Sequence, residues 1–447
     1  MASTYLSRSI SSTGNRKIAT LSVWLKRGNV GGMAVFSTGS ANTDDFMIYM
    51  PDPDIQVLAR VSSSTVLDLR TDRVLRDVSA WYHVVVEIDT TQATASNRVK
   101  LYINGEQETS FSTETYPSQN QDLHINESGY TNYIGNLRGS GNHFDGLMTH
   151  FHLIDGTAYD ADTFGQTDST TGIWKPKLSP SVTYGTNGFF LKFENSGAMG
   201  TDSSGNTNTF AVSGGTCTQT IDTPTNNFNV MNSEINIPNA TFSNGNTMIT
   251  DGDNAHKSFY GTFAVSKGKY YWEAKAVSGT KYTIGLNNVK NSFNYQQVTN
   301  TNNIVGDAAT SYRDGDAIGW YFSTLYKNGS QIATGLDTIV TNDIMQCAID
   351  LDAGKIYFGR NGTWRVANST TFDPAQNDTT FTTGEFYVPT FSIEGCSWET
   401  NFGNGYFGTA AVSSAQNPDD GIGIFEYTVP SGFKALCTKS INAQEYS

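Results

Sequence analysis

The chain has 447 residues, of which 43 are glycine and only 16% are charged, and its formal net charge is −14. An acidic surface repels phosphate backbones, so this charge excludes duplex DNA and RNA as favoured partners. Aromatic residues favour strands, while glycine, asparagine and serine favour the turns between them, so we expect an all-β protein of two or three domains.

The first 165 residues carry the alternating pattern of an antiparallel sandwich. The stretches IATLSVWLK (18–26) and WYHVVVEID (81–89) place apolar side chains at alternate positions, as in half-buried strands. VKLYI (99–103) follows, and Asn104-Gly105 after it is the dipeptide of a tight hairpin. Strands at this density, separated by turn residues, predict a sandwich or jelly roll of about ten strands or more.

The run from His143 to Lys177 closes this sandwich and begins a connector. Its first part alternates around Phe151 and Leu153, and Asp155-Gly156 then signals a turn. Trp174-Lys175-Pro176 ends the run, because proline cannot continue a central strand.

We therefore predict two sandwiches, at residues 1–165 and 228–410, joined by a Gly/Ser/Asn-rich connector at 166–227. Within the connector, GFFLKF (188–193) is expected to pair onto the edge of the first sandwich, because an isolated strand buries too little apolar surface to be stable. Residues 411–447 are expected to form a last strand and turn, followed by a polar arm or tail.

The second sandwich shows the same pattern as the first, with strand-forming stretches separated by turn residues. FYGTFAVSKGKYYWEAKA (259–276) predicts two strands around a turn, and AIGWYFS (317–323) predicts another. DIMQCAIDL (343–351) leads through Ala353-Gly354 into KIYFG (355–359), as in a hairpin.

Cys217, Cys347, Cys396 and Cys437 are far apart and lack the paired spacing of zinc sites. Since Cys347 and Cys396 lie in apolar, strand-like contexts, we expect buried free thiols. The N-terminus has no basic segment followed by an apolar core, and no stretch is long and apolar enough to span a membrane. We therefore expect synthesis in a cytoplasm without a signal peptide or membrane insertion.

The first half resembles laminin G-like, concanavalin A-like lectin domains. The resemblance is carried by the order of TLSVWLKR, WYHVVVEID, VKLYINGEQ, NYIGN and FDGLMTHFHLIDG, and it covers about residues 4–164. It implies a lectin-like sandwich, a fold that also hosts glucanases.

The second half is similar to SPRY domains, on the series GKYYWE, YTIGL, AIGWYF, IDLDAGKIYFGRNGTW, VPTFSI and NFG. SPRY domains are binding modules without catalysis, and their partner-binding loops vary, so no binding residue is carried over. The connector stretches FGQTDSTTGIWKPK and YGTNGFFLKFENSGAMGTDSSGNTNTF look like the linker of structural proteins of tailed bacteriophages, particularly those of marine bacteria.

Exposed aromatic side chains stack on sugar rings, so tyrosines in Gly/Asn/Ser-rich stretches are candidate glycan contacts. These are Tyr116, Tyr130, Tyr133, Tyr295 and Tyr312. The alternative is that each tyrosine packs locally or at a subunit interface.

We predict no cofactor, with calcium as the open alternative, because lectin-like sandwiches often bind it through loop carboxylates and carbonyls. The candidate ligands are Asp44, Asp45, Asp52, Asp54 and Asp145. Short acidic loops also form plain turns.

Two groups of residues invite a chemical interpretation. Glucanases of this fold carry Glu-x-Asp-x-(x)-Glu on one strand, but Glu87-Ile88-Asp89 is followed by Thr, Thr and Gln, so the proton donor is missing. His143, His150 and His152 are clustered, with the last two predicted on one strand face, but the spacing indicates no third metal ligand. We therefore predict no enzymatic activity, and a solvent-facing or interface role for the histidines.

These interpretations predict a non-enzymatic protein of a phage virion surface, a fibre, knob or decoration, whose lectin-like modules contact host cell-surface glycans. The alternatives are a purely architectural decoration, collar or fibre subunit without a ligand, and a polysaccharide depolymerase. The sequence has no heptad repeat, which favours a compact homo-oligomer, for example a trimer, in contact with other virion proteins.

Overall fold

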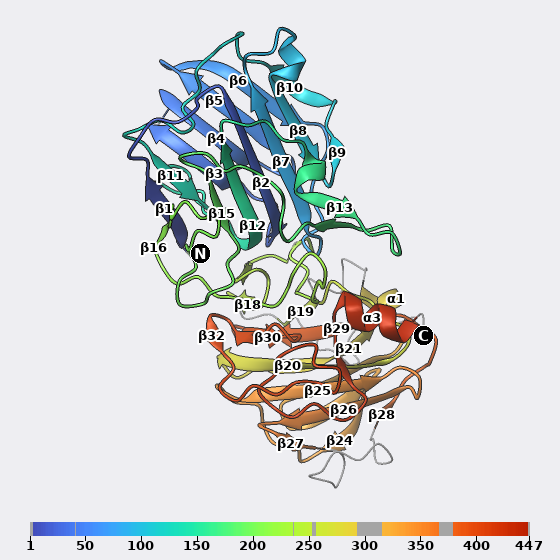
Figure 1. Cartoon of the computed structure of the whole chain (residues 1–447). Helices are drawn as coiled ribbons and strands as arrows, with labels where there is room; N and C mark the ends of the chain where they lie inside the picture. Colours follow the sequence, from blue (N-terminus) through green and yellow to red (C-terminus); the bar gives the residue numbers. More distant parts are fainter. Residues whose placement is uncertain are drawn as a thin grey trace. The chain divides into compact units, whose positions relative to one another are not determined.

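The computed structural model of the chain describes residues 3–40, 42–235, 237–252, 256–292, 315–365 and 379–445. The chain forms two compact units, residues 1–219 and 220–447 (Figure 1). No helix in these described ranges is long and apolar enough to cross a membrane.

The first unit is a sandwich of two antiparallel sheets, which we call sheet A and sheet B. The described strands of sheet A are, in spatial order, β10 (Phe111–Thr115), β6 (Ser64–Thr71), β5 (Gln56–Val61), β4 (Asp44–Met50), β3 (Met33–Ser40), β11 (Thr131–Ile134), β1 (Tyr5–Ser9) and β16 (Ala211–Ser213). Those of sheet B are β15 (Phe189–Leu191), β12 (Gly146–Asp155), β2 (Ile18–Arg27), β7 (Tyr82–Asp89), β8 (Val99–Ile103) and β9 (Glu106–Gln107). Alternation turns the apolar face of each sheet inward, where the side chains form one core.

Two edge strands of this sandwich come from the connector. β15 pairs antiparallel with β12 at the edge of sheet B, where the sequence predicted an added strand. β16 pairs with β1 at the edge of sheet A. The connector as far as Gln219 therefore belongs to the first unit.

The first part of the connector, together with the residues just before it, covers the outer face of sheet B. It contains a 3-10 helix, Ala161–Thr163, and a two-stranded ribbon of β13 (Gly165–Thr167) and β14 (Trp174–Pro176). The apolar contacts under this cover are made by Val85, Ile154, Ala161 and Phe164, with Tyr102, Tyr159, Trp174, Val182 and Tyr184 packed against them.

Trp174 fixes the ribbon to the sheet. Its indole Nε1 donates a hydrogen bond of 3.0 Å to Nδ1 of His83 on β7. The ring lies against Gly105 and Gly165, where an added Cβ would come within 3.0 Å and 2.2 Å of its atoms. These glycines leave the space that the indole occupies.

The second unit is also a sandwich of two sheets. The strands described for its larger sheet are β17 (Ala240–Ser243), β18 (Met248–Asp251), β30 (Ser397–Asn401), β20 (Lys269–Ser278), β25 (Ile344–Asp350), β26 (Lys355–Arg360) and β27 (Thr363–Trp364), with β28 (Thr379–Thr380) on β26 and β33 (Lys434–Ala435) on β20. Those of its smaller sheet are β19 (Lys257–Tyr260), β29 (Tyr387–Ile393), β21 (Tyr282–Asn288), β22 (Ala317–Tyr321), β23 (Thr324–Lys327) and β24 (Ser330–Thr334). A short helix α1 (Val289–Ser292) follows β21, and β31 (Tyr406–Phe407) pairs with β32 (Ala410–Ala411). Buried apolar residues of both sheets form a core between them. A second cluster joins Tyr271, Ala348 and Tyr357 of the larger sheet to the C-terminal segment.

All four cysteines are free, and Cys347, Cys396 and Cys437 are buried, which confirms the prediction of buried thiols. The prediction of a polar arm or tail at the C-terminus is wrong, because Thr438–Glu445 forms helix α3. Ile441 of this helix packs against the core of the unit. Oε1 of Gln444 accepts from the backbone N of Lys269 at 2.8 Å.

A buried glutamate also holds the C-terminal segment. Glu273 on β20 is fully buried, and its carboxylate accepts from the backbone N of Glu426 and of Tyr427, each at 2.9 Å. The hydroxyl of Tyr271 donates to it at 2.8 Å. Removal from water raises the pKa of Glu273 to about 7.

We expect Trp174→Phe to lower the unfolding free energy of the first unit by about 1–3 kcal/mol, because Nδ1 of buried His83 loses its donor. Urea titration followed by hydrogen exchange in each unit measures the change. Ser169→Ala is the matched control, since Ser169 is exposed in the loop of the same ribbon. Equal stability of Trp174→Phe and the wild type would contradict the anchoring role of the indole.

The stability of the second unit should depend on pH through Glu273. The folded pKa is raised, so ionisation is disfavoured in the folded state, and stability falls as pH rises from the unfolded pKa toward the folded value near 7. From pH 5 to 8, the wild type should lose about 2–3 kcal/mol relative to Glu273→Gln. Glu385 is half-buried and its pKa is lowered by the hydrogen bond from Lys290, so it stays ionised over this range and Glu385→Gln should leave the wild-type slope unchanged. Parallel pH profiles of the wild type and Glu273→Gln would disprove the effect.

Candidate functional site

Three half-buried aromatic side chains meet on the outer face of sheet A. Tyr5 lies on β1 and Tyr133 on the neighbouring β11, and their ring centroids are 6.0 Å apart. His143 lies in the loop before β12, with its ring centroid 6.0 Å from that of Tyr5. We call Tyr5, Tyr133 and His143 the aromatic cluster.

The strand period places these tyrosines outside the core. Tyr133 stands between Asn132 and Ile134, which are both buried, and Leu6 beside Tyr5 is buried as well. Because successive side chains of a strand point to opposite faces, the two tyrosines point away from the core. The sequence predicted Tyr133 as a candidate, and the same alternation could have identified Tyr5.

His143 was missed as a partner of the tyrosines because its place depends on the fold of the loop between β11 and β12. Nδ2 of Asn136 lies 3.1 Å from Nδ1 of His143. Gly139 in the same loop lies against Tyr133, where an added Cβ would come 3.3 Å from the ring. The loop therefore supports two members of the cluster.

Asp45 anchors this loop to the sheet. It is fully buried, and its Oδ2 lies 2.9 Å from Nη1 of Arg60 and 2.6 Å from Nη1 of Arg138 in the loop. Burial raises the pKa of Asp45, and the two arginines oppose that rise. The Asp45 carboxylate therefore fixes the side chains of Arg60 and of Arg138, which lies in the loop.

The five aspartates predicted as calcium ligands are distributed among separate contacts. Asp45 pairs with arginines, as described above. Asp54 pairs with Arg70, and Asp44 pairs with His124. Asp145 accepts a hydrogen bond from Asn29, and Asp52 is exposed. Within the described ranges, no group of three or more His, Cys, Asp or Glu side chains has the arrangement of a metal site.

The other predicted tyrosines do not join the aromatic cluster. The ring of Tyr130 packs edge-on against His124, with centroids 5.5 Å apart. The hydroxyl of Tyr116 donates to Oε1 of Glu114 at 3.0 Å, and burial raises the pKa of Tyr116 to about 12. Tyr295 and Tyr312 lie outside the described residues.

His150 and His152 share the outer side of sheet B, since both contact the ring of Phe190, at centroid distances of 5.7 Å and 3.9 Å. The prediction of a solvent-facing or interface role is wrong for His152, which is 1% exposed. The connector covers it, and its Nδ1 lies 2.9 Å from the hydroxyl of Tyr184. Burial lowers the pKa of His150 to about 4 and that of His152 well below its usual value, so both are neutral at pH 7.

Ser22 and His83 form a buried pair that resembles half of a catalytic triad, with Oγ of Ser22 2.9 Å from Nε2 of His83. An indole is only a donor, so the bond from Trp174 requires an unprotonated Nδ1. Burial lowers the pKa of His83 to about 3, so the ring is neutral and its proton sits on Nε2. His83 therefore donates to Ser22 and cannot take its proton, which a general base must do.

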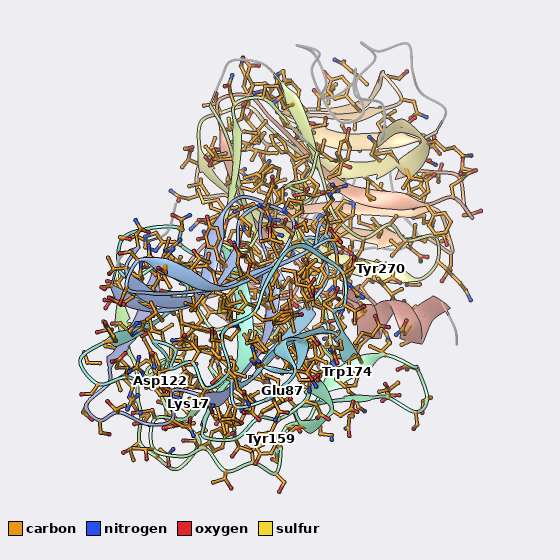
Figure 2. All side chains as sticks on the ribbon, turned by 90° about the horizontal axis from the view of Figure 1, so that it is seen from above. Lys17, Glu87, Asp122, Tyr159, Trp174 and Tyr270 are labelled. Carbon is orange, nitrogen blue, oxygen red and sulfur yellow. The ribbon has the colours of Figure 1, made fainter. Side chains whose placement is uncertain are left out.

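Glu87 and Asp89 are both held by local hydrogen bonds. Oε1 of Glu87 lies 2.9 Å from Nζ of Lys100, and Oε2 accepts from the hydroxyl of Tyr102 at 2.8 Å. Oδ1 of Asp89 accepts from the backbone N of Thr91 at 3.1 Å, as in an Asx turn. Figure 2 shows Glu87 in the same part of the first unit as Tyr159 and Trp174, which belong to the segment that covers sheet B.

Two family matches cover the two sandwiches. Residues 2–162 match the concanavalin A-like lectin/glucanases superfamily, and residues 269–405 match the SPRY domain. The search of curated proteins gave no match. Neither family match bears on the phage origin, which stays a prediction.

Three solved structures are similar to parts of the chain. The SPRY domain of human HERC1 is 19% identical, with a TM-score of 0.26 over 36% of this chain and 91% of that chain. The native heptameric SAP-like pentraxin from Limulus polyphemus is 18% identical, with a TM-score of 0.27 over 35% and 71%. The TRIM65 PSpry domain is 14% identical, with a TM-score of 0.26 over 39% and 91%. At these TM-scores the similarity adds nothing to the family matches.

The positions and order of the two matches agree with the two sandwiches of the structure. The resemblances seen in the sequence are thereby confirmed for both halves. The chain carries a concanavalin A-like (laminin G) lectin/glucanase domain followed by a SPRY domain.

Proposed function

We propose that this chain is a non-enzymatic binding protein of a phage virion surface, and that its first domain contacts host cell-surface glycans through the aromatic cluster. The observation that carries the proposal is the meeting of Tyr5, Tyr133 and His143 on the outer face of a lectin-like sandwich. Aromatic rings that are rigid, half-exposed and close together present an apolar surface on which a sugar ring can stack.

The loop beside the cluster supplies the polar groups that a glycan requires. Its residues 138–142 are Arg, Gly, Ser, Gly and Asn, and the side chains of Ser140 and Asn142 are exposed. Arg138 is held in place by Asp45, so the loop is positioned before a ligand arrives. A shallow surface of this kind favours weak binding at each site, and several copies on one particle would raise the avidity.

Two arrangements support a protein without catalysis. The proton of His83 points toward Ser22, so this pair has no general base. Glu87 is occupied by Lys100 and Tyr102 on the face of sheet B that the connector covers. Release of reducing sugars from a host polysaccharide would contradict this part of the proposal.

The virion location is supported by the resemblance of the connector to linkers of phage structural proteins. In that setting the SPRY domain, a member of a family of binding modules, would contact other virion proteins. Labelled antibodies against the chain should mark a fixed position on imaged phage particles. If the antibodies label no purified particle of the phage that encodes the chain, the virion location is refuted.

We expect Tyr133→Ala to weaken glycan binding about tenfold, because loss of one stacked ring costs about 1.4 kcal/mol. A glycan array identifies the ligand, and titration calorimetry then measures the change. Tyr116→Ala is the matched control, because Tyr116 makes no ring contact with the cluster among the described residues. A wild-type protein that binds no glycan, or equal losses in both variants, would count against the cluster as the contact site.

A purely architectural role is the second candidate, and exposed apolar residues of the connector favour it. Ile173 and Leu178 are 54% and 67% exposed, although apolar side chains of this size are commonly buried. We propose that a second copy of the chain covers them in a homo-oligomer.

Light scattering should therefore give an oligomer for the wild type and a smaller mass for the double variant Ile173→Ser, Leu178→Ser, because the interface loses its apolar contacts. Val74→Ser serves as the control, since Val74 is also exposed, at 44%, but lies outside the connector. A monomeric wild type at the concentrations reached on a particle would exclude this interface.

A further inference from the structure

A row of polar side chains crosses the core side of sheet A. Arg8 on β1 is the register partner of Asn132 on β11. Tyr133 faces Ser37 in the pairing of β11 with β3, so one step further along the antiparallel pair Asn132 faces Thr38.

This row points inward. Leu6, Ile134 and Phe36 lie two positions from Arg8, Asn132 and Thr38, respectively, and all three belong to the core between the sheets. Side chains two positions apart on a strand share a face. Asn132 and Thr38 are accordingly 0% exposed.

Most of the polar atoms of this row have no hydrogen-bond partner. They are both side-chain amide atoms of Asn132, the hydroxyl of Thr38 and Nη1 of Arg8. Buried polar groups in folded proteins are nearly always bonded, so these atoms point to an occupant that the protein does not supply.

The charge of Arg8 also lacks a direct partner. Its Nη2 bonds to the side-chain oxygen of Asn208, which is neutral, and it makes no ion pair in the described part of the chain. Burial lowers the pKa of Arg8, and the charge of Asp202 opposes this shift only in part. The carboxylate of Asp202 accepts hydrogen bonds from the backbone N of Phe190 and of Asn208, each within 2.9 Å.

We propose that Arg8, Thr38 and Asn132 bind a small inorganic anion of the size of chloride. The guanidinium, the amide nitrogen and the hydroxyl supply hydrogen-bond donors, which suit an anion. The positive charge of Arg8 disfavours a cation, and a water molecule would leave that charge unbalanced. The place between two packed sheets favours a monatomic ion over a larger oxyanion.

The bound ion would join the N-terminal strand β1 to β11 and β3 from the core side. Tyr5 and Tyr133 lie on the opposite face of β1 and β11, so the ion would stabilise the strands that carry the aromatic cluster. The anion site itself does not depend on the proposed glycan contact.

Thermal unfolding of the full chain tests the site with sodium chloride as the probe. At equal ionic strength, chloride should raise the Tm of the first unit by about 2–4 °C relative to gluconate, which is too large to enter. Crystals grown in bromide should show an anomalous peak beside Arg8, Thr38 and Asn132. Equal Tm values in the two salts, or an empty site in bromide, would overturn the proposal.

Asn132→Asp supplies a second test, because its carboxylate would take the place of the anion next to Arg8. We expect this variant to match or exceed the wild-type Tm in gluconate and to lose the response to chloride. Ser9→Asp is the control: it adds the same charge on β1, on an exposed side chain, and should keep the chloride response. A chloride response that persists in Asn132→Asp would assign the effect to another part of the chain and reject this site.

Discussion

The hydrogen bond from the indole of Trp174 to Nδ1 of His83 limits which surfaces of the first domain can contact a ligand. It fixes the connector ribbon over the outer face of sheet B, and it fixes the tautomer of His83, whose proton then points to Ser22. This bond therefore keeps the outer face of sheet B covered, and it leaves His83 unable to act as a general base. Contacts with a large ligand are left to surfaces that the connector does not cover, and the outer face of sheet A is one of them.

On sheet A, β1 and β11 present different chemistry to each side. Tyr5 and Tyr133 face outward as neighbouring rings, while Arg8 and Asn132 face the core without sufficient partners. Burying the unpaired polar atoms of Arg8 and Asn132 costs folding free energy unless a bound group forms hydrogen bonds with them. The proposed anion would therefore act on the aromatic cluster through the same two strands.

Alternation and turn dipeptides were sufficient to predict both sandwiches, because each strand has one apolar face and each tight turn has a recognisable dipeptide. At Asn104-Gly105, for example, both residues have positive φ, at 51° and 86°. The site was less predictable. Tyr133 follows from local composition, whereas the contact of His143 with Tyr5 joins residues that are far apart in sequence. Helix α3 and the burial of His152 were missed for the same reason, since distant segments determine them.

Both domains bury central strands on two faces, and this explains where their unusual polar groups lie. In the first domain, His83 and Ser22 satisfy each other and Trp174 under the connector. In the second, Glu273 on β20 receives the backbone of the segment that follows the last long strands. A buried polar residue of this kind gives a covering segment one defined place, because any shift leaves a donor or acceptor unpaired. The perturbed pKa values of His83 and Glu273 therefore mark where the chain closes over its sheets, and a search for the ligand should begin on surfaces away from them.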